Sequence, residues 1–171
     1  MKKTNDTLIE DFQALYNRQV NRVYKLAIVM LGSRTDAEDV VQMVFLKVWE
    51  KKINFQDQDH ETAWILTVTR NQCKDILKSY DRKHCSPQEE MPQSGIAFET
   101  PMENAVWLAL KSLEEKYRLL LYLYYYEGYS VRELTKILRR KESTLQTQLA
   151  AGRRKLKEIL QSQSEKEGGA K

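Results

Sequence analysis

The sequence predicts an all-α protein with two small helical domains joined by a flexible linker. The 171 residues include only 6 glycines and 3 prolines, and leucine, lysine, glutamate and glutamine are frequent, which favours helices. All three prolines fall within residues 85–101, where Ser, Gln and Glu also accumulate, as is typical of a linker. The domains are then residues 1–84 and 102–161, and residues 162–171 are expected to form a disordered tail.

Two helices are predicted at the start of the first domain. The first runs over about Asp6–Leu31 and stops at Gly32, which favours a helix C-terminus. Ser33 or Thr35 then caps a second helix, Asp36–Lys51, whose acidic first turn suits the helix dipole.

The second helix has two different faces. Its predicted inward face carries apolar residues at helical spacing: Ala37, Val40, Val41, Val44, Phe45 and Val48. The opposite face combines a carboxylate and an amide with two apolar side chains: Asp39, Gln42, Met43 and Leu46. That face is either a set of scattered surface apolar residues or a docking surface, and spacing alone leaves both interpretations open.

A third helix is predicted over Ala63–Lys83, after a polar loop at residues 51–62. We expect an apolar side formed by Trp64, Ile65, Val68, Ile76 and Leu77. The same helix carries five cations, Arg70, Lys74, Lys78, Arg82 and Lys83, and the first three share one face. The aromatic and amide side chains of Trp64, Asn71 and Tyr80 lie among these cations. Such a face suits single-stranded or opened DNA, because phosphates meet cations and unstacked bases meet rings. A solvated basic surface is the alternative.

No cofactor, metal or membrane span is expected. Cys73 and Cys85 are the two cysteines, and without a recognisable export signal we expect both to be reduced, in the cytoplasm. Together with His84 they lack a fourth ligand at a recognisable spacing, so no metal site is predicted. No segment holds eighteen consecutive apolar residues.

The second domain is expected to contain four helices. The first covers Asn104–Leu113, and the second runs through a tyrosine-rich stretch that Gly128 closes. Ser130 and Glu133 form a capping box at the start of the third. The fourth helix would bury Leu145, Leu149, Leu156 and Leu160. The third and fourth helices have the proportions of a helix-turn-helix.

Basic charge is concentrated in this last part of the chain. Residues 130–160 hold nine Lys or Arg against three Glu, a difference of +6, whereas the whole chain carries +4. A local excess of this size favours DNA as a partner.

At these residues the chain resembles the small, extracytoplasmic-function (ECF) type of RNA polymerase sigma factor, in the sigma-70 family. Phe12–Trp49, with the motif DAEDVVQMVF, is similar to the family's segment that binds core polymerase. Ala63–Arg82, with WILTVTRN, is similar to its promoter-opening helix. Lys111–Leu138, with YYYEGYS, and Ser143–Leu160 are similar to its C-terminal helix-turn-helix.

The resemblance implies two surfaces on the first domain. One faces the clamp helices of the largest polymerase subunit and comprises Asp36, Glu38, Asp39, Gln42, Met43 and Leu46. The other grips the melted minus-ten element and comprises Trp64, Arg70, Asn71, Lys74, Lys78 and Arg82. The loop Asn54–Thr62 would take a flipped base into a pocket.

The resemblance also implies that the last helix enters the major groove at the minus-thirty-five element. Here the turn is Leu138-Arg139-Arg140-Lys141 and lacks the family's usual glycine, at a cost of roughly 1 kcal/mol if Arg139 adopts positive φ. Lys141 replaces the usual capping hydroxyl, so Ser143 is an alternative cap for a later start. The expected DNA-binding residues are Arg139, Arg140, Lys141, Ser143, Thr144, Gln146, Thr147, Gln148, Arg153 and Arg154.

Within that set, we expect the arginines and Lys141 to hold phosphates, and Gln146 and Gln148 to read adenine by paired hydrogen bonds. The implied partners are core polymerase, including its flap, promoter DNA and an anti-sigma factor, with no small-molecule substrate. A stand-alone helix-turn-helix regulator is the alternative, although it would not need the two surfaces of the first domain. An enzyme is disfavoured, because no phosphate loop, nucleophile–base pair or paired catalytic carboxylates are recognisable.

Overall fold

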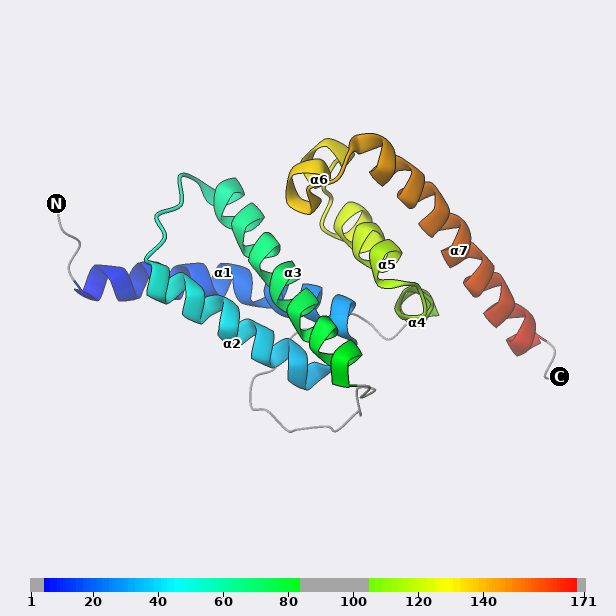
Figure 1. Cartoon of the computed structure of the whole chain (residues 1–171), viewed down its shortest axis with the longest axis horizontal. Helices are drawn as coiled ribbons and strands as arrows, with labels where there is room; N and C mark the ends of the chain where they lie inside the picture. The colour runs from blue at the N-terminus through cyan, green and yellow to red at the C-terminus, as the bar shows by residue number, and fades with distance from the viewer. Residues whose placement is uncertain (1–4, 84–104, 169–171) are drawn as a thin grey trace. The chain divides into compact units, whose positions relative to one another are not determined.

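The computed structural model describes residues 5–83 and 105–168, which form two separate compact units (Figure 1). Every regular element in these two ranges is helical, so the all-α prediction is confirmed. No helix within them is long and apolar enough to cross a membrane. The predicted linker, residues 85–101, lies outside the described residues.

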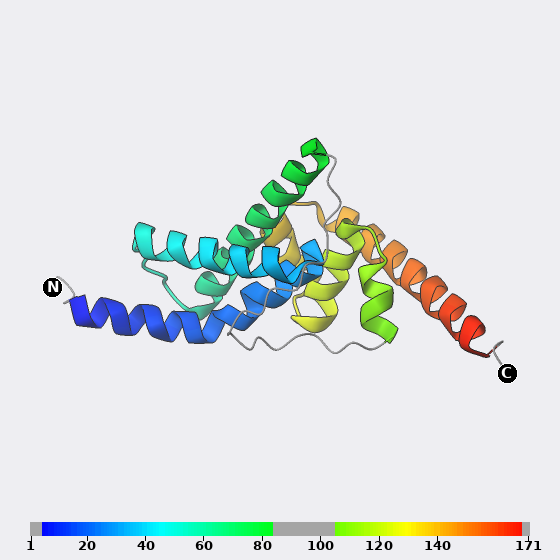
Figure 2. The ribbon, with the colours of Figure 1, turned by 90° about the horizontal axis from the view of Figure 1, so that it is seen from below.

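Three helices form the first unit: α1 (Asn5–Leu31), α2 (Arg34–Lys51) and α3 (Gln58–Lys83). Each packs against the other two (Figure 1, Figure 2). The core between them is apolar, and it includes all six residues predicted for the inward face of α2. The period of 3.6 residues therefore identified this face correctly from the sequence.

The boundary between α1 and α2 follows the predicted signals. Gly32 adopts φ +72°, and its amide donates to the Ile28 carbonyl oxygen at 2.9 Å. The Ser33 hydroxyl accepts from the Asp36 amide at 3.3 Å, so Ser33, and not Thr35, is the N-cap. Positive φ is accessible to glycine without steric cost, which explains why the chain turns there.

The third helix begins earlier than predicted, at Gln58 instead of Ala63. Asp57 provides the start, because its carboxylate accepts from the His60 amide at 2.7 Å and its carbonyl oxygen accepts from Glu61 at 3.0 Å. The observed loop before α3 is correspondingly shorter than expected. Five of the twelve residues assigned to it, residues 58–62, therefore belong to the first turns of α3.

The second unit contains α4 (Ala105–Lys111), α5 (Glu115–Leu121), a π-helix η1 (Tyr122–Tyr126), α6 (Val131–Leu138) and α7 (Glu142–Gly168). The long helix α7 packs against α4, α5 and α6 (Figure 1). Within α7, Leu145 and Leu149 are buried as predicted, whereas Leu156 and Leu160 are only half-buried. The helix also continues past residue 161, where the sequence-based domain boundary had placed its end.

The π-helix is a feature that the sequence analysis missed. The amides of Glu127 and Tyr129 reach back to the carbonyl oxygens of Tyr122 and Leu123, at 3.2 and 3.1 Å. One turn is thereby widened within what was predicted as a single regular helix. Gly128, with φ +78°, then closes the segment as expected.

The capping box of α6 is present as predicted. The Ser130 hydroxyl accepts from the Glu133 amide at 3.3 Å, and the Glu133 carboxylate accepts from the Ser130 amide at 2.8 Å. The Ser130 hydroxyl also donates to that carboxylate at 2.6 Å, and this bond, together with the bond from the Ser130 amide, lowers the pKa of Glu133 below its usual value. The carboxylate is therefore charged at neutral pH, as the helix dipole favours.

The turn between α6 and α7 confirms the strain expected without glycine. Arg139 adopts φ +52°, in the left-handed region. The Leu145 amide donates to the Lys141 carbonyl oxygen at 3.1 Å, and α7 begins at the next residue. The alternative of a later start capped by Ser143 is therefore wrong, and Lys141 occupies the N-cap position.

We expect the substitution Arg139→Gly to stabilise the second unit by up to about 1 kcal/mol, because glycine reaches positive φ without a clash. Lys136→Gly, within α6, is the matched control and should destabilise by about 1 kcal/mol. Amide hydrogen exchange in α6 and α7 of the full chain measures both effects. Faster exchange in both variants would contradict the assignment of strain to Arg139.

Candidate docking and nucleic-acid surfaces

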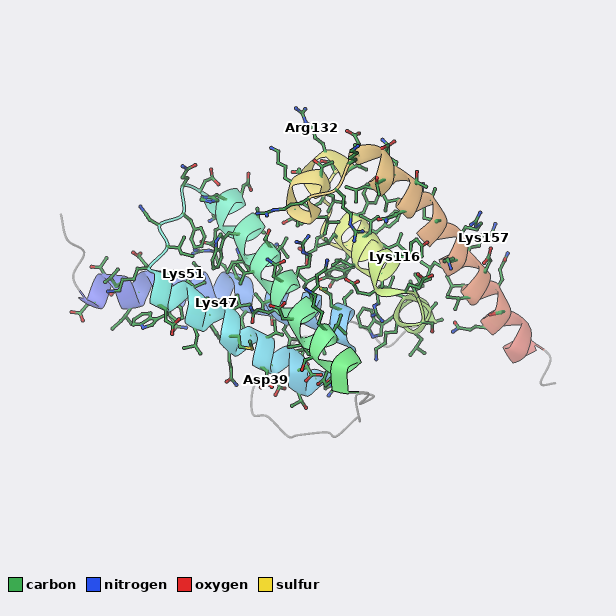
Figure 3. The ribbon with its side chains drawn as sticks, in the orientation of Figure 1. Asp39, Lys47, Lys51, Lys116, Arg132 and Lys157 are labelled. Atoms are coloured by element: carbon green, nitrogen blue, oxygen red, sulfur yellow. The ribbon has the colours of Figure 1, made fainter. Side chains whose placement is uncertain are left out.

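The outer face of α2 carries four of the six predicted docking residues in one row. Asp39, Gln42, Met43 and Leu46 are all exposed, as the helical spacing predicted. Of the two apolar residues, Leu46 is the more open, with 57% of its surface accessible against 39% for Met43. Figure 3 shows Asp39 on the outer side of this helix. We call these four residues, together with Trp49, the α2 stripe.

Trp49 extends the stripe and was missed in the sequence analysis. It is 46% exposed and lies three residues after Leu46, so spacing could have identified it. Its ring packs edge-on against Phe12 of α1, with centroids 5.1 Å apart. Phe12 in turn contacts Phe45, and Phe45 contacts Tyr16, with centroids 6.3 and 4.6 Å apart. A large apolar ring is thus held on the surface by an aromatic cluster.

Asp36 and Glu38 do not belong to this row. Both are half-buried, and Asp36 accepts a hydrogen bond from the Tyr80 hydroxyl at 2.7 Å. That bond ties the start of α2 to the last turns of α3. The structure therefore brings together four of the six predicted docking residues and gives Asp36 a partner within the protein.

The outward face of α3 carries four of the predicted DNA-binding residues. Asn71 and Lys78 are exposed, and Trp64 and Lys74 are half-buried beside them at helical spacing. Phe55 packs against both Trp64 and His60, with centroids 5.7 Å apart in each pair. The loop before α3 and the helix thus present aromatic rings and cations together.

The predicted inward face of α3 was partly wrong. Ile65 is buried as predicted, but the other four expected residues, Trp64, Val68, Ile76 and Leu77, are half-buried, and most of the buried residues lie further around the helix. These buried residues are Glu61, Ile65, Leu66, Thr69, Arg70, Gln72 and Cys73. Polar groups were not expected there, because burying them requires partners that a one-dimensional pattern does not reveal.

Arg70 is the clearest correction. It was expected on the basic face, but it is buried, with 9% of its surface accessible. One of its guanidinium nitrogens donates to the Asn71 side-chain oxygen at 3.1 Å. The long aliphatic stem of arginine can pack in a core, so a cation in a helical row does not by itself mark a solvent-facing group. The side chain of Arg82 lies outside the described residues.

A buried polar network fixes the start of α3 on α1. The Glu61 carboxylate accepts from Arg18 at 2.9 and 3.3 Å and from Gln19 at 2.9 Å. Gln19 also donates to the Thr62 hydroxyl at 3.1 Å and accepts from Arg22 at 2.9 Å. The network lies directly before Trp64 and therefore holds the beginning of the α3 outward face in place.

In the second unit, most of the predicted DNA-binding residues are exposed. They are Arg139, Lys141, Ser143, Thr144, Gln146, Thr147, Arg153 and Arg154. Arg140 and Gln148 are half-buried, and the Arg140 guanidinium donates to the Gln148 side-chain oxygen at 2.9 Å. Paired hydrogen bonds from Gln148 to adenine require that oxygen. Gln148 is thus held toward the turn, and its adenine-reading role stays a prediction.

Other cations surround the helix-turn-helix. Arg153 donates to the Tyr125 hydroxyl at 3.3 Å, and Lys155 pairs with Glu114 at 3.1 Å. Arg132 on α6 and Lys157 on α7 are exposed and extend away from the unit (Figure 3). Among the described residues, no group of three His, Cys, Asp or Glu side chains is placed to hold a metal ion. Cys73 is buried, whereas His84 and Cys85 lie outside the described residues.

Each unit matches a model of the same protein family. Residues 15–83 match sigma-70 region 2, and residues 103–156 match sigma-70, region 4. The chain belongs to the sigma-70 family. It is 24% identical to the ECF RNA polymerase sigma factor SigX of Bacillus subtilis (strain 168), a match that covers 81% of this chain and 77% of SigX. These matches place it in the ECF type, as the sequence resemblance implied.

Two further proteins are similar to this sigma-70 family member. The ECF RNA polymerase sigma factor SigE of Mycolicibacterium smegmatis is 28% identical, over 88% of this chain and 62% of SigE. The sigma factor RpoE of Bartonella quintana, solved with the anti-sigma factor NepR, has a TM-score of 0.71 and 20% identity. That likeness covers 89% of this chain and 98% of RpoE, and it concerns the fold.

The buried position of Arg70 in this sigma-70 family member leads to a stability prediction. Arg70→Ala should lower the free energy of unfolding by about 1–3 kcal/mol, because it removes a buried side chain and its hydrogen bonds. Lys78→Ala, at an exposed position of the same helix, should change it by no more than about 0.5 kcal/mol. Urea unfolding followed by circular dichroism compares the two. Equal stability of both variants would argue for a solvent-facing Arg70.

Proposed function

We propose that this chain is an RNA polymerase sigma factor, which binds core polymerase and recognises and opens promoter DNA. One observation carries the proposal: a single chain contains sigma-70 region 2 and region 4 in that order. The α2 stripe and the outward face of α3 lie on the first of these, and the helix-turn-helix lies on the second. A stand-alone regulator is disfavoured, because it needs only the second.

We propose that the α2 stripe docks on the clamp helices of the largest polymerase subunit. Asp39 supplies a charge that sets orientation, and Met43, Leu46 and Trp49 supply apolar area. Large exposed apolar side chains in a row are typical of protein interfaces. The second unit would contact the flap of the polymerase.

We propose that the outward face of α3 holds the melted minus-ten element. Lys74 and Lys78 would meet phosphates, Asn71 would donate to or accept from a base, and Trp64 would stack on an unpaired base. The adjoining rings of Phe55 and His60 support a role for the preceding loop in accepting a flipped base.

We propose that α7 enters the major groove of the minus-thirty-five element, with α6 crossing the DNA backbone. Arg139, Lys141, Arg153 and Arg154 are exposed around the helix and would meet phosphates. Sigma factors are initiation factors without enzymatic activity, and we propose the same here. Such a role requires the cytoplasm, and the RpoE–NepR complex supports an anti-sigma factor as a further partner.

Transcription from a genomic fragment library tests the proposed function directly. Core polymerase alone and core polymerase with this protein are compared, and the transcripts are sequenced. We expect start sites that appear only when the protein is present and that share two upstream elements. If the protein bound fragments without enabling initiation by core polymerase, the stand-alone regulator would be the better interpretation.

The α2 stripe leads to a prediction about assembly. Asp39→Ala combined with Leu46→Ala should weaken core binding by about thirtyfold or more, because each change removes more than about 1 kcal/mol from an interface centre. The conservative pair Asp39→Glu with Leu46→Met is the control and should bind nearly as well as wild type. Titration with labelled core polymerase measures affinity, and circular dichroism checks the helix content. Unchanged affinity of the alanine pair would rule out this docking surface.

The outward face of α3 leads to a prediction about promoter opening. Lys74→Ala combined with Lys78→Ala should leave core binding intact but reduce the open complex, since two phosphate contacts are lost. The salt dependence of opening should become shallower by a slope of roughly one to two. Asp75→Ala, on the same face but of opposite charge, is the control and should not reduce opening. Permanganate footprints of normal strength in the lysine pair would count against the assignment.

A further inference from the structure

We propose that the first turns of α7 read the exocyclic amino groups of cytosine and adenine, with Glu142 as a specificity-determining residue. The proposal rests on the proposed function, because it concerns the base-reading surface of the helix-turn-helix. Glu142 was not among the residues that the sequence analysis expected to contact DNA. Its place in the structure and the hydrogen bonds around it carry the argument.

The side of α7 that is free to meet DNA is determined by the opposite, buried side. Leu145 and Leu149 pack inward, and Ser143 and Thr147 lie on the opposite side of the helix. Glu142 and Gln146 are nearer to the buried side in helical angle, but both are exposed at this end of the helix. The first residues of a recognition helix are the ones that reach base edges. The exposed residues in these first turns are Glu142, Ser143, Thr144, Gln146 and Thr147.

Glu142 and Gln146 are joined by a hydrogen bond that orients the glutamine. The Gln146 amide nitrogen donates to a Glu142 carboxylate oxygen at 3.3 Å. A carboxylate can only accept, so it must be the nitrogen of Gln146 that faces Glu142. The carbonyl oxygen of Gln146 therefore points away from Glu142, and it offers an acceptor to an incoming base.

Thr147 is oriented in the same sense. Its hydroxyl donates to the Ser143 carbonyl oxygen at 2.9 Å, one turn earlier in α7. The hydroxyl proton is thereby used within the helix, while the oxygen keeps its capacity to accept. Three neighbouring exposed side chains, Glu142, Gln146 and Thr147, thus present acceptors.

Gln148 is held on the flank of the helix, toward the turn. A guanidinium can only donate, so the Gln148 oxygen must be the atom that faces Arg140. Gln148 is half-buried there, unlike the exposed Gln146. This bond engages the Gln148 oxygen and not its N–H donors, so the acceptor character of the outward surface rests on the three exposed side chains, Glu142, Gln146 and Thr147.

Acceptors on the protein select donors on the bases. In the major groove, cytosine offers its N4 amino group and adenine its N6 amino group, whereas guanine O6 and N7 and thymine O4 are acceptors. A carboxylate beside guanine or thymine at the same position faces another acceptor and is repelled. Glu142 should favour cytosine most, since adenine also carries the N7 acceptor next to its amino group. Gln146 accepts from either amino group.

The competing explanation is that Glu142 only stabilises α7, because it lies in the first turn, where the helix dipole favours an acidic residue. The two roles differ in what they change. Helix stabilisation affects every DNA sequence alike, whereas base reading affects the preference at one position. The experiment must therefore measure the base preference at one position of the DNA site, and not only the overall affinity.

The test uses holoenzyme assembled from core polymerase and the full chain. Promoter DNA with a randomised upstream element is selected for binding, and the bound fraction is sequenced. Wild type is compared with Glu142→Gln, which keeps the shape but adds a donor, and with Gln146→Ala. Glu158→Gln, an exposed carboxylate further along α7, is the charge-matched control.

We expect wild type to prefer cytosine or adenine over guanine and thymine by about tenfold at one position, and Glu142→Gln to reduce that preference to about threefold or less. Gln146→Ala should relax the preference at a neighbouring position, and Glu158→Gln should change neither. An unchanged preference in Glu142→Gln, or a wild-type preference for guanine or thymine at the affected position, overturns the proposal. If no upstream sequence is selected while minus-ten selection persists, the proposed minus-thirty-five role of the second unit fails as well.

Discussion

A helix that buries one face can offer only the opposite face to a partner, and this constraint governs every surface proposed for the chain. In α2, Val40, Val44 and Val48 are buried, so the α2 stripe is exposed on the other side. In α7, the burial of Leu145 and Leu149 has the same effect on Ser143 and Thr147. The apolar core thus determines the direction of the polar groups that are proposed to meet polymerase or DNA.

Burial of a charge adds a second constraint in the first unit. Glu61 is almost inaccessible, and a buried carboxylate is costly unless it is paired and hydrogen-bonded. Arg18 and Gln19 provide those bonds from α1, so the first turns of α3 can lie only where these partners reach. Trp64 follows directly after these first turns in the sequence, and Phe55 packs against it. The network therefore limits how far the proposed minus-ten surface can shift. A purely apolar contact would leave more freedom to slide.

Much of this fold could be predicted from the sequence because its signals are local. Gly32, the Ser130–Glu133 capping box and the apolar face of α2 each depend on a few neighbouring residues, and each appears as predicted. The strain at Arg139 follows from the same kind of reasoning, since a turn that needs positive φ has no glycine to supply it.

The parts that were missed depend on partners distant in the sequence or on small differences in period. Glu61 and Arg70 are polar residues in a core, and their burial follows from groups on other turns and helices. The hydrogen bonds of the π-helix at Tyr122–Tyr126 span five residues, and those of an α-helix span four. Four of its five residues are tyrosines, so the sequence pattern does not reveal this difference. The hydrogen bond between Arg140 and Gln148 joins residues eight positions apart, so neither residue type by itself predicts it.

These contacts also change how the positive charge near the helix-turn-helix acts. A cation bonded to a neutral group keeps its charge, so Arg140 with Gln148 and Arg153 with Tyr125 still attract DNA over a distance. Lys155 is different, because Glu114 neutralises it. In the proposed complex, long-range attraction would come from most of the cations, whereas direct phosphate contacts would come from the exposed cations on both sides of the first turns of α7. With cations at the flanks and acceptors between them, the flanking contacts would supply affinity without regard to sequence, and the acceptors would discriminate among bases.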